Sequence, residues 1–140
     1  MANTIHVDIV SAEGEIFSGP AKMVFLPAAE GEIGVAPRHA PLLALLKAGE
    51  VRVQSPDGDE QSFYVGGGAL EVQPTKVTVL ADTAARAADL DEAAALAARQ
   101  RAEEALAGKI DKLEQAEALA ELARAAAQLK LIQRLRKIRG

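Results

Sequence analysis

Residues 76–98 read KVTVLADTAARAADLDEAAALAA, and one kind of secondary structure gives way to another within them. Up to Ala81 apolar and polar side chains alternate, as they do in a strand with one buried face. Beyond Asp82 alanine dominates, and alanine favours helix more strongly than any other residue. All six prolines come before this junction. The sequence therefore predicts a β domain over residues 1–85 and a helical domain over residues 86–140.

The first predicted domain has the pattern of a β-sandwich. Short alternating or apolar stretches recur between turn signals, at residues 5–9, 23–26, 51–53, 62–65, 70–72 and 76–80. Pro27 is predicted to stop the second of these stretches, because proline cannot donate to a sheet ladder. Strands at this spacing imply an antiparallel sandwich or a flattened barrel.

The second predicted domain is an antiparallel two-helix hairpin. Asp89 and Glu92 match a capping box, and Gly108 is predicted to end the first helix near Leu106. A second helix is predicted over residues 111–139. The face expected to be apolar holds Leu90, Ala94, Ala97, Arg101 and Ala105 on the first helix, and residues 113, 116, 119, 122, 126, 129, 132, 135 and 138 on the second. An alanine face stabilises packing only weakly, so we expect the hairpin to detach or extend.

Composition excludes several classes of function. The chain has 140 residues, no cysteine, no tryptophan, 3% aromatic residues and a net charge of −4. Without cysteine there is no disulfide scaffold, thiolate zinc site or cysteine catalysis. The acidic balance and the few aromatic residues argue against nucleic-acid binding. No apolar run approaches the ~18 residues of a membrane span, and the N-terminus lacks the pattern of a secretory signal.

No group of residues predicts a catalytic, metal or cofactor site. His6 and His39 lie far apart in the sequence, and a metal site needs three or four converging ligands. His6 is predicted to be a surface or structural histidine on a strand. The run of residues 66–68 is all glycine but lacks the lysine and the helix of a phosphate loop, so it is interpreted as a bulge or a close strand crossing. We therefore expect no catalytic residue, no cofactor and no metal.

Charge is unevenly divided between the two predicted domains. Residues 1–82 carry 11 acidic and 5 basic side chains, whereas residues 83–140 carry 9 acidic and 11 basic ones. The stretch 124–140 has no acid and contains Arg124, Lys130, Arg134, Arg136, Lys137 and Arg139. Such asymmetry indicates a partner more than a catalytic site. The loop of residues 30–41, hinged by glycine and stiffened by two prolines, is interpreted as a contact surface.

Several motifs, in the same order along the chain, resemble the epsilon-subunit family of bacterial F-type ATP synthases. They lie at residues 10–13, 17–19, 31–34, 39–43, 67–72, 77–82, 89–93 and 121–125. The resemblance implies a β-sandwich of about ten strands followed by a helical hairpin, in a non-catalytic subunit of the rotating central stalk. It also implies a peripheral position at the cytoplasmic face of the bacterial inner membrane, held only through the complex.

The same resemblance implies where the sandwich meets its partners. The expected contacts are Glu30, Gly31 and Glu32 with the ring of c subunits, and Arg38, His39, Ala40 and Pro41 with the gamma subunit. The sandwich would then couple torque between ring and stalk.

For the hairpin, the resemblance implies two positions. It would lie folded on the sandwich, or extend into the catalytic alpha/beta head and inhibit ATP hydrolysis. The residues expected to carry inhibition, against an acidic segment of the catalytic beta subunit, are Arg124, Lys130, Arg134, Arg136 and Lys137.

An ATP-binding motif known from some members of that family is incomplete in this sequence. The motif has the form Ile/Leu-Asp-x-x-Arg-Ala, and this chain has Leu90 and Asp91 but Ala94 at the arginine position. A methyl group cannot replace a guanidinium that meets phosphate. We therefore expect weak ATP binding or none.

Two other classes of function remain open on the sequence. One is a free-standing adaptor, with the β-sandwich as a binding module and the hairpin for dimerisation. The other, an enzyme, has the least support, because no constellation of residues favours it. Co-purification with gamma and c subunits from native membranes would separate the first from the family interpretation.

Overall fold

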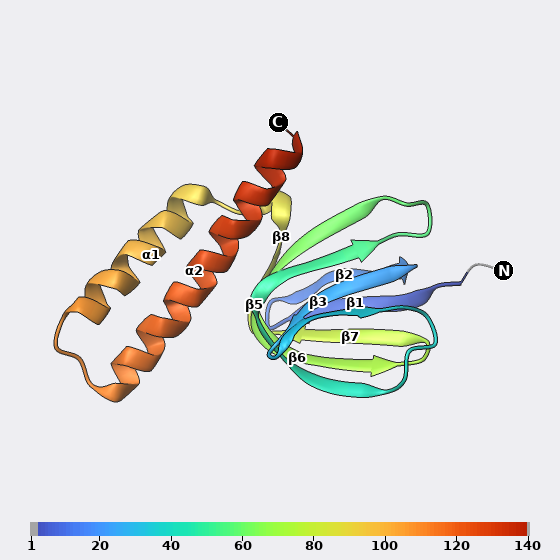
Figure 1. The fold of residues 1–140 in the computed structure, drawn as a ribbon, viewed down its shortest axis with the longest axis horizontal. Helices are drawn as coiled ribbons and strands as arrows, with labels where there is room; N and C mark the ends of the chain where they lie inside the picture. Colours follow the sequence, from blue (N-terminus) through green and yellow to red (C-terminus); the bar gives the residue numbers. More distant parts are fainter. Residues whose placement is uncertain (1–2, 140) are drawn as a thin grey trace. The chain divides into compact units, whose positions relative to one another are not determined.

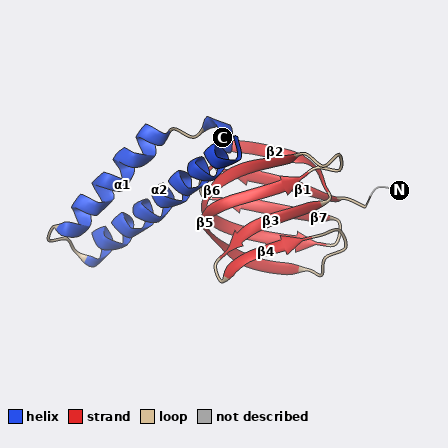
Figure 2. Cartoon of the chain, turned by 45° about the horizontal axis from the view of Figure 1, so that its top comes forward, coloured by secondary structure: helices blue, strands red, loops and turns tan. Residues whose placement is uncertain are grey.

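The computed structural model describes residues 3–139, which divide into two compact units. Residues up to Arg86 form the first, and residues from Ala87 onward form the second. Figure 2 shows that the first unit is built from strands and the second from helices. The composition and the family resemblance both predict that strands give way to helices near this boundary.

Eight strands are found in the described part of the first unit. They are β1 (Ile5–Ser11), β2 (Gly14–Ala21), β3 (Met23–Ala28), β4 (Gly31–Val35), β5 (Leu42–Gln54), β6 (Glu60–Gln73), β7 (Lys76–Ala81) and β8 (Ala84–Arg86). They hydrogen-bond in the order β2-β1-β7-β6-β5-β3-β4, and β8 pairs with β6. All neighbours are antiparallel except β1 and β7, which run parallel.

The predicted β-sandwich is confirmed, with fewer strands than the ten expected. β5 and β6 are long continuous strands of 13 and 14 residues, and both curve strongly along their length (Figure 1). One half of β6 pairs with β7 and the other half with β8. Each of these long strands bends into both layers and so takes the place of two shorter strands. The described part therefore has eight strands instead of about ten.

The core follows the alternation seen in the sequence. Ile5, Val7 and Ile9 of β1 are fully buried, whereas His6 and Asp8 between them point outward. The enclosed cluster also takes residues from β3, β5, β6 and β7, with Phe63 the largest of its fully buried side chains. Because burial fixes which face each strand turns inward, it also fixes the residues that the outer face presents.

Two local predictions for the strands concern Pro27 and the glycine run of residues 66–68. Pro27 was expected to stop β3, but β3 continues to Ala28. The expectation was wrong because Pro27 lies where the register between β3 and β5 shifts, and an irregular ladder tolerates proline. The glycine run lies inside β6, where the pairings with β5 and β7 show no register shift, so the bulge was wrong. The other alternative, a close approach of two strands, is confirmed: Gly68 has φ 138°, and a Cβ there would lie 2.1 Å from the Leu80 carbonyl oxygen.

The second unit contains a short 3-10 turn, η1 (Ala87–Asp89), and two helices, α1 (Glu92–Ala107) and α2 (Lys112–Arg139). The capping box at Asp89 is wrong. Asp91 is the N-cap of α1, and its Oδ1 accepts a hydrogen bond from the Ala94 N–H at 3.2 Å. Gly108 ends α1 as predicted, and Asp111 caps α2 by accepting from the Glu114 N–H at 2.8 Å.

The buried face differs from the predicted one on α1 and agrees with it only in part on α2. On α1 the buried residues are Ala95 and Ala102, not the set that includes Ala94 and Arg101. On α2 the buried positions are Ala118, Ala125, Leu129 and Leu131. Of these, Leu129 was predicted, whereas the predicted Leu113 and Leu119 are exposed. The buried alanines recur at intervals of seven residues, which suits two long helices in close contact. The buried residues of α1 are alanines, as the prediction of a methyl-rich face requires, and the weakness of this packing stays a prediction.

Candidate functional site

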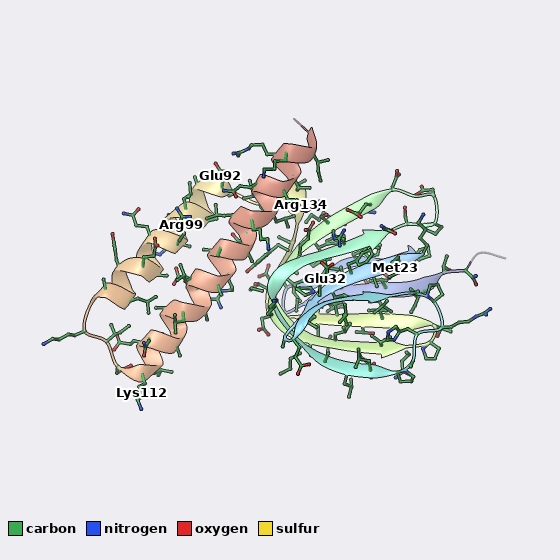
Figure 3. All side chains as sticks on the ribbon, in the orientation of Figure 1. Met23, Glu32, Glu92, Arg99, Lys112 and Arg134 are labelled. Atoms are coloured by element: carbon green, nitrogen blue, oxygen red, sulfur yellow. The ribbon has the colours of Figure 1, made fainter. Side chains whose placement is uncertain are left out.

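The turn between β3 and β4 presents the first predicted contact residues. Gly31 adopts φ 141°, a conformation that favours glycine, and it allows the chain to reverse directly after Glu30. Glu32 follows on β4, opposite Pro27 of β3. Its side chain is 57% exposed, so the carboxylate is accessible from solvent; Figure 3 labels this residue on the sandwich.

Arg52 of β5 holds Glu32, a relationship that sequence reasoning missed. Its Nη2 donates to Glu32 Oε1 at 3.2 Å, and its Nη1 lies 3.9 Å from Glu60 Oε2. The guanidinium carbon lies 4.4 Å from the centre of the Phe25 ring, which is within range of a cation–π interaction. In the sequence, Arg52 is marked only as the polar position of the alternating stretch 51–53. That position does not identify Glu32 or Glu60 as its partners.

A pocket of about 500 Å³ adjoins the same turn. It is lined by residues 28–33 and by Leu42, Leu43, Ala44 and Leu45 at the start of β5. Its lining is therefore mostly apolar and includes the carboxylate residues Glu30 and Glu32. The lining thus combines hydrophobic area with negative charge.

The second predicted contact region, Arg38 to Pro41, is a short loop that leads into β5. Arg38 has φ 68°, in the left-handed region that costs a non-glycine residue energy. Its N–H donates to the Pro74 carbonyl at 2.9 Å, which ties the loop to the β6–β7 turn. His39 donates from Nδ1 to the Ala40 carbonyl at 2.7 Å. The backbone of this loop is thus fixed, and Arg38 and Ala40 are exposed.

An exposed apolar row begins where this loop ends. Leu45, Ala69, Leu80 and Val10 are successive register partners across β5, β6, β7 and β1. Leu45 is 69% exposed and Leu80 is 55% exposed, and Leu43, on the same face of β5, is 77% exposed, whereas Ala69 and Val10 are half-buried. Contiguous apolar residues on an outer sheet face are typical of a protein interface. Sequence reasoning placed these residues in strands without recognising that they form one surface.

A polar network lies on the neighbouring strands and supports the fold. Asp8 accepts hydrogen bonds from Ser18 Oγ at 2.6 Å and from His6 Nε2 at 2.9 Å, and Lys76 Nζ lies 3.1 Å from its other oxygen. The hydrogen bond from Ser18, helped by Lys76 and His6, holds the pKa of Asp8 below its ordinary value of about 3.8. The serine proton is directed at aspartate and not at histidine, so this group lacks the arrangement of a hydrolytic triad.

Two ion pairs join the helices of the second unit. Arg136 Nη2 of α2 lies 2.7 Å from Glu92 Oε2 of α1, and Arg101 Nη2 of α1 lies 3.2 Å from Glu121 Oε1 of α2. Of the other basic residues expected to inhibit, Lys130 and Lys137 are exposed, and Arg124 and Arg134 are half-buried. The side chain of Arg139 lies outside the described part of the structure.

The incomplete nucleotide motif lies at the start of α1. Asp91 is engaged as the helix cap, Leu90 precedes it, and Ala94 is exposed in the first turn. The motif therefore offers one carboxylate, already bonded to backbone, and no cation. Nothing in these three residues complements a phosphate group.

The described residues 3–139 contain neither a metal-binding cluster nor a membrane-spanning helix. No three His, Asp or Glu side chains among them lie close enough together to hold a metal ion. Neither described helix combines the length and the apolar character that a membrane crossing requires.

Comparison with protein families gives two adjoining matches. Residues 4–87 match the family model described as ATP synthase, Delta/Epsilon chain, beta-sandwich domain. Residues 88–133 match the one described as ATP synthase, Delta/Epsilon chain, long alpha-helix domain. Together the two matches span most of the chain and meet at the junction between the compact units.

Similar proteins of bacterial origin bear one name. The chain is 67% identical over 140 residues to the ATP synthase epsilon chain of Nitrosococcus oceani, covering 100% of both chains. It is 62% identical over 135 residues to that of Alkalilimnicola ehrlichii, covering 96% of each. It is also 59% identical to ATP synthase epsilon chain 1 of Methylococcus capsulatus, over the full length of both.

Solved structures share the fold at low identity. One is a cryo-EM structure of the Euglena gracilis mitochondrial ATP synthase, OSCP/F1/c-ring, with a TM-score of 0.79 and 19% identity over 91% of this chain and 79% of that one. Another, of the Tetrahymena thermophila mitochondrial ATP synthase central stalk and c-ring, has a TM-score of 0.65 and 12% identity over 91% of this chain and 96% of that one.

Proposed function

The chain belongs to the ATP synthase delta/epsilon family, and we propose that it joins the gamma subunit to the c ring in the rotor and restrains ATP hydrolysis with its helical hairpin. As an epsilon chain of this family it is a non-catalytic subunit of the complex. In this proposal it acts at the cytoplasmic face of the bacterial inner membrane, where its partners hold it during proton-driven ATP synthesis.

The observation that best supports the proposal is the exposed apolar row. Leu45 and Leu80 lie at two positions of a row that crosses four strands, and Leu43 extends it toward the Arg38–Pro41 loop. Neighbouring exposed leucines on the outer face of a sandwich favour a protein partner. We assign this face, together with Arg38, His39, Ala40 and Pro41, to the gamma subunit.

Replacement of two leucines tests that assignment. Leu45→Glu with Leu80→Glu would place charge where apolar burial is needed, and burying each leucine is worth about 1.5–3 kcal/mol. Co-purification of gamma with the full-length variant should fall by at least about tenfold. Leu113→Glu, at an exposed leucine of α2, is the matched control and should retain gamma. Equal recovery of gamma with the double variant and the control would contradict the assignment.

We assign the c-ring contact to Glu30, Gly31 and Glu32. The carboxylate of Glu32 is exposed on β4 beside the β3–β4 turn, and an arginine or lysine on the ring would be attracted to it. Glu32→Lys should impair proton-coupled ATP synthesis while the isolated protein keeps its melting temperature. Because exposed charges are screened by salt, the contact should also weaken as ionic strength rises. Normal coupling in the variant would contradict this contact.

We assign inhibition to the basic end of α2. Lys130 and Lys137 are exposed, and with Arg124, Arg134 and Arg136 they give α2 a positive charge that suits an acidic surface of the catalytic head. Replacing Lys130 and Lys137 with alanine leaves the Arg136–Glu92 pair in place. Hydrolysis by the assembled complex should rise, by a factor that shrinks at high salt.

A further inference from the structure

We propose that Arg52 is a positioning residue for Glu32, fixing its carboxylate in the orientation in which the second oxygen meets a cation of the ring. The inference rests on the proposed function, since it takes Glu32 as the residue that contacts the ring. Its basis is the group formed by Phe25, Glu32, Arg52 and Glu60, which we call the Arg52 cluster.

The cluster spans three strands. Arg52 of β5 pairs in register with Phe25 of β3, and Phe25 pairs with Gly34 of β4. To reach Glu32 on β4, the Arg52 side chain must therefore cross β3, and it does so over the Phe25 ring, 4.4 Å from its centre. Gly34 leaves room for this arrangement, because a Cβ there would lie 2.7 Å from Met23 Cε and 3.2 Å from the Phe25 ring.

Arg52 is itself held from several sides. Glu32 accepts a hydrogen bond from Nη2 at 3.2 Å, Glu60 lies 3.9 Å from Nη1, and the Phe25 ring supports the guanidinium plane. The Arg52 side chain is only 26% exposed, against 57% for Glu32. A planar guanidinium can stack and bridge two carboxylates at once, which a lysine ammonium cannot do in the same way. Arg52 is thus the fixed member of the cluster, and Glu32 is the member that it orients.

Two effects of Arg52 on ring binding oppose each other. Its positive charge weakens the attraction between Glu32 and a cation on the ring. That attraction acts between exposed charges, however, and salt screens it within about 10 Å. Its hydrogen bond removes rotamer freedom from Glu32 before the ring arrives, so less freedom is lost on binding. With Glu60 included the cluster keeps a net negative charge, and attraction to a cation survives. Orientation therefore dominates, and Arg52 should strengthen the contact.

The test is a titration of the purified full-length chain onto membrane vesicles stripped of it. The measured quantity is the concentration that restores half of the proton-driven ATP synthesis. Arg52→Gln should raise that concentration by about 2- to 10-fold, and Arg52→Lys by less. Lys22→Gln, which removes an exposed cation outside the cluster, is the matched control and should leave it unchanged. Melting temperatures of the variants check that each chain is folded.

Variants that keep Glu32 separate positioning from a merely structural role. If Arg52 acts by orienting the carboxylate, Arg52→Gln melts at the normal temperature and still requires a higher concentration for half of the synthesis, and Arg52→Lys lies between Arg52→Gln and the unaltered chain. If Arg52 were only structural, the required concentration would rise only in variants whose melting temperature falls, which would overturn the inference.

The experiment distinguishes a wrong role for Arg52 from a wrong assignment of the ring contact. An unchanged half-saturation for Arg52→Gln, together with a raised one for Glu32→Gln, overturns the role of Arg52 and leaves the ring contact standing. An unchanged value for both variants overturns the ring contact itself.

Discussion

Arg136, near the end of α2, donates to Glu92 in the first turn of α1 across 2.7 Å, although 44 residues separate them in sequence. The pair closes the hairpin at the end opposite its connecting turn. Its guanidinium belongs to the basic stretch that we propose to bind the catalytic head. Arg136 thus binds Glu92 in the closed hairpin and is proposed to bind the catalytic head in the extended one. The two forms of the hairpin compete for this side chain.

This competition predicts the effect of Glu92→Gln. The variant removes the partner of Arg136 only in the closed hairpin, and both side chains are largely exposed, so the change is about 0.2–1 kcal/mol. More of the extended, inhibitory form should be present, and ATP hydrolysis by the assembled complex should fall by up to about fivefold. Glu103→Gln is the control, because Glu103 pairs only weakly within α1, at 3.9 Å from Arg99. Faster hydrolysis in Glu92→Gln than in the control would contradict the competition.

Nucleotide binding should be absent or weak, because α1 offers a methyl group where phosphate needs a cation. Isothermal titration calorimetry of the full-length chain with ATP should show no binding in the micromolar range. Ala94→Arg adds a guanidinium at an exposed position in the first turn of α1 and should raise affinity. A low micromolar dissociation constant for the unaltered chain would mean that another cation, such as Arg86 or Arg99, serves in place of the motif arginine.

Acid sensitivity of the sandwich should depend on Ser18. Because the Ser18 hydroxyl lowers the pKa of Asp8, the ionised carboxylate stabilises the fold at neutral pH. That stabilisation is complete above the unfolded pKa, near 3.8, and is lost as pH falls through the lower folded value. Ser18→Ala should raise the pKa of Asp8, measured by NMR titration of its carboxyl carbon, and should reduce stability at pH 7 while having little effect near pH 2. An unchanged Asp8 titration would show that Lys76 and His6 suffice.

The left-handed backbone of Arg38 predicts an unusual gain from glycine. A non-glycine residue in this region costs about 1–2 kcal/mol, and the entropy that glycine loses on folding offsets about half of the gain. Arg38→Gly should therefore be more stable than Arg38→Ala, which keeps the strain and also lacks the side chain. Urea unfolding of the two variants gives the comparison. Equal midpoints would mean that the loop relaxes around alanine.

Much of the fold was predictable because simple patterns determine it. Alternation places Ile5, Val7 and Ile9 inward, and the change to alanine marks where strands give way to helices. The helix face was harder, because nearly every side of α1 carries alanine, so a shift of one residue from Ala94 to Ala95 leaves the pattern almost unchanged. The cap moved for a similar reason, since Asp89 and Asp91 are both suitable and only the η1 turn distinguishes them.

The contact surfaces were predictable only in part. The turn at Gly31 and the loop at Arg38 are unusual in sequence and attract notice on their own. Arg52 and the Leu45–Leu80 row are not, since each residue looks like an ordinary strand position. Their importance comes from strand register, which joins residues 20 to 35 positions apart, and a single sequence does not reveal that register.

Removal of the hairpin tests the central claim most directly. A chain ending at Ala88 keeps the whole compact unit up to Arg86, so it should fold, co-purify with gamma and support assembly of the complex. The measurement is the rate of ATP hydrolysis by that complex against the complex with the full-length chain. The account predicts faster hydrolysis with the shortened chain, because the inhibitory α2 is absent. Hydrolysis no faster than that of the intact complex would contradict it, and the hairpin would then have no restraining role.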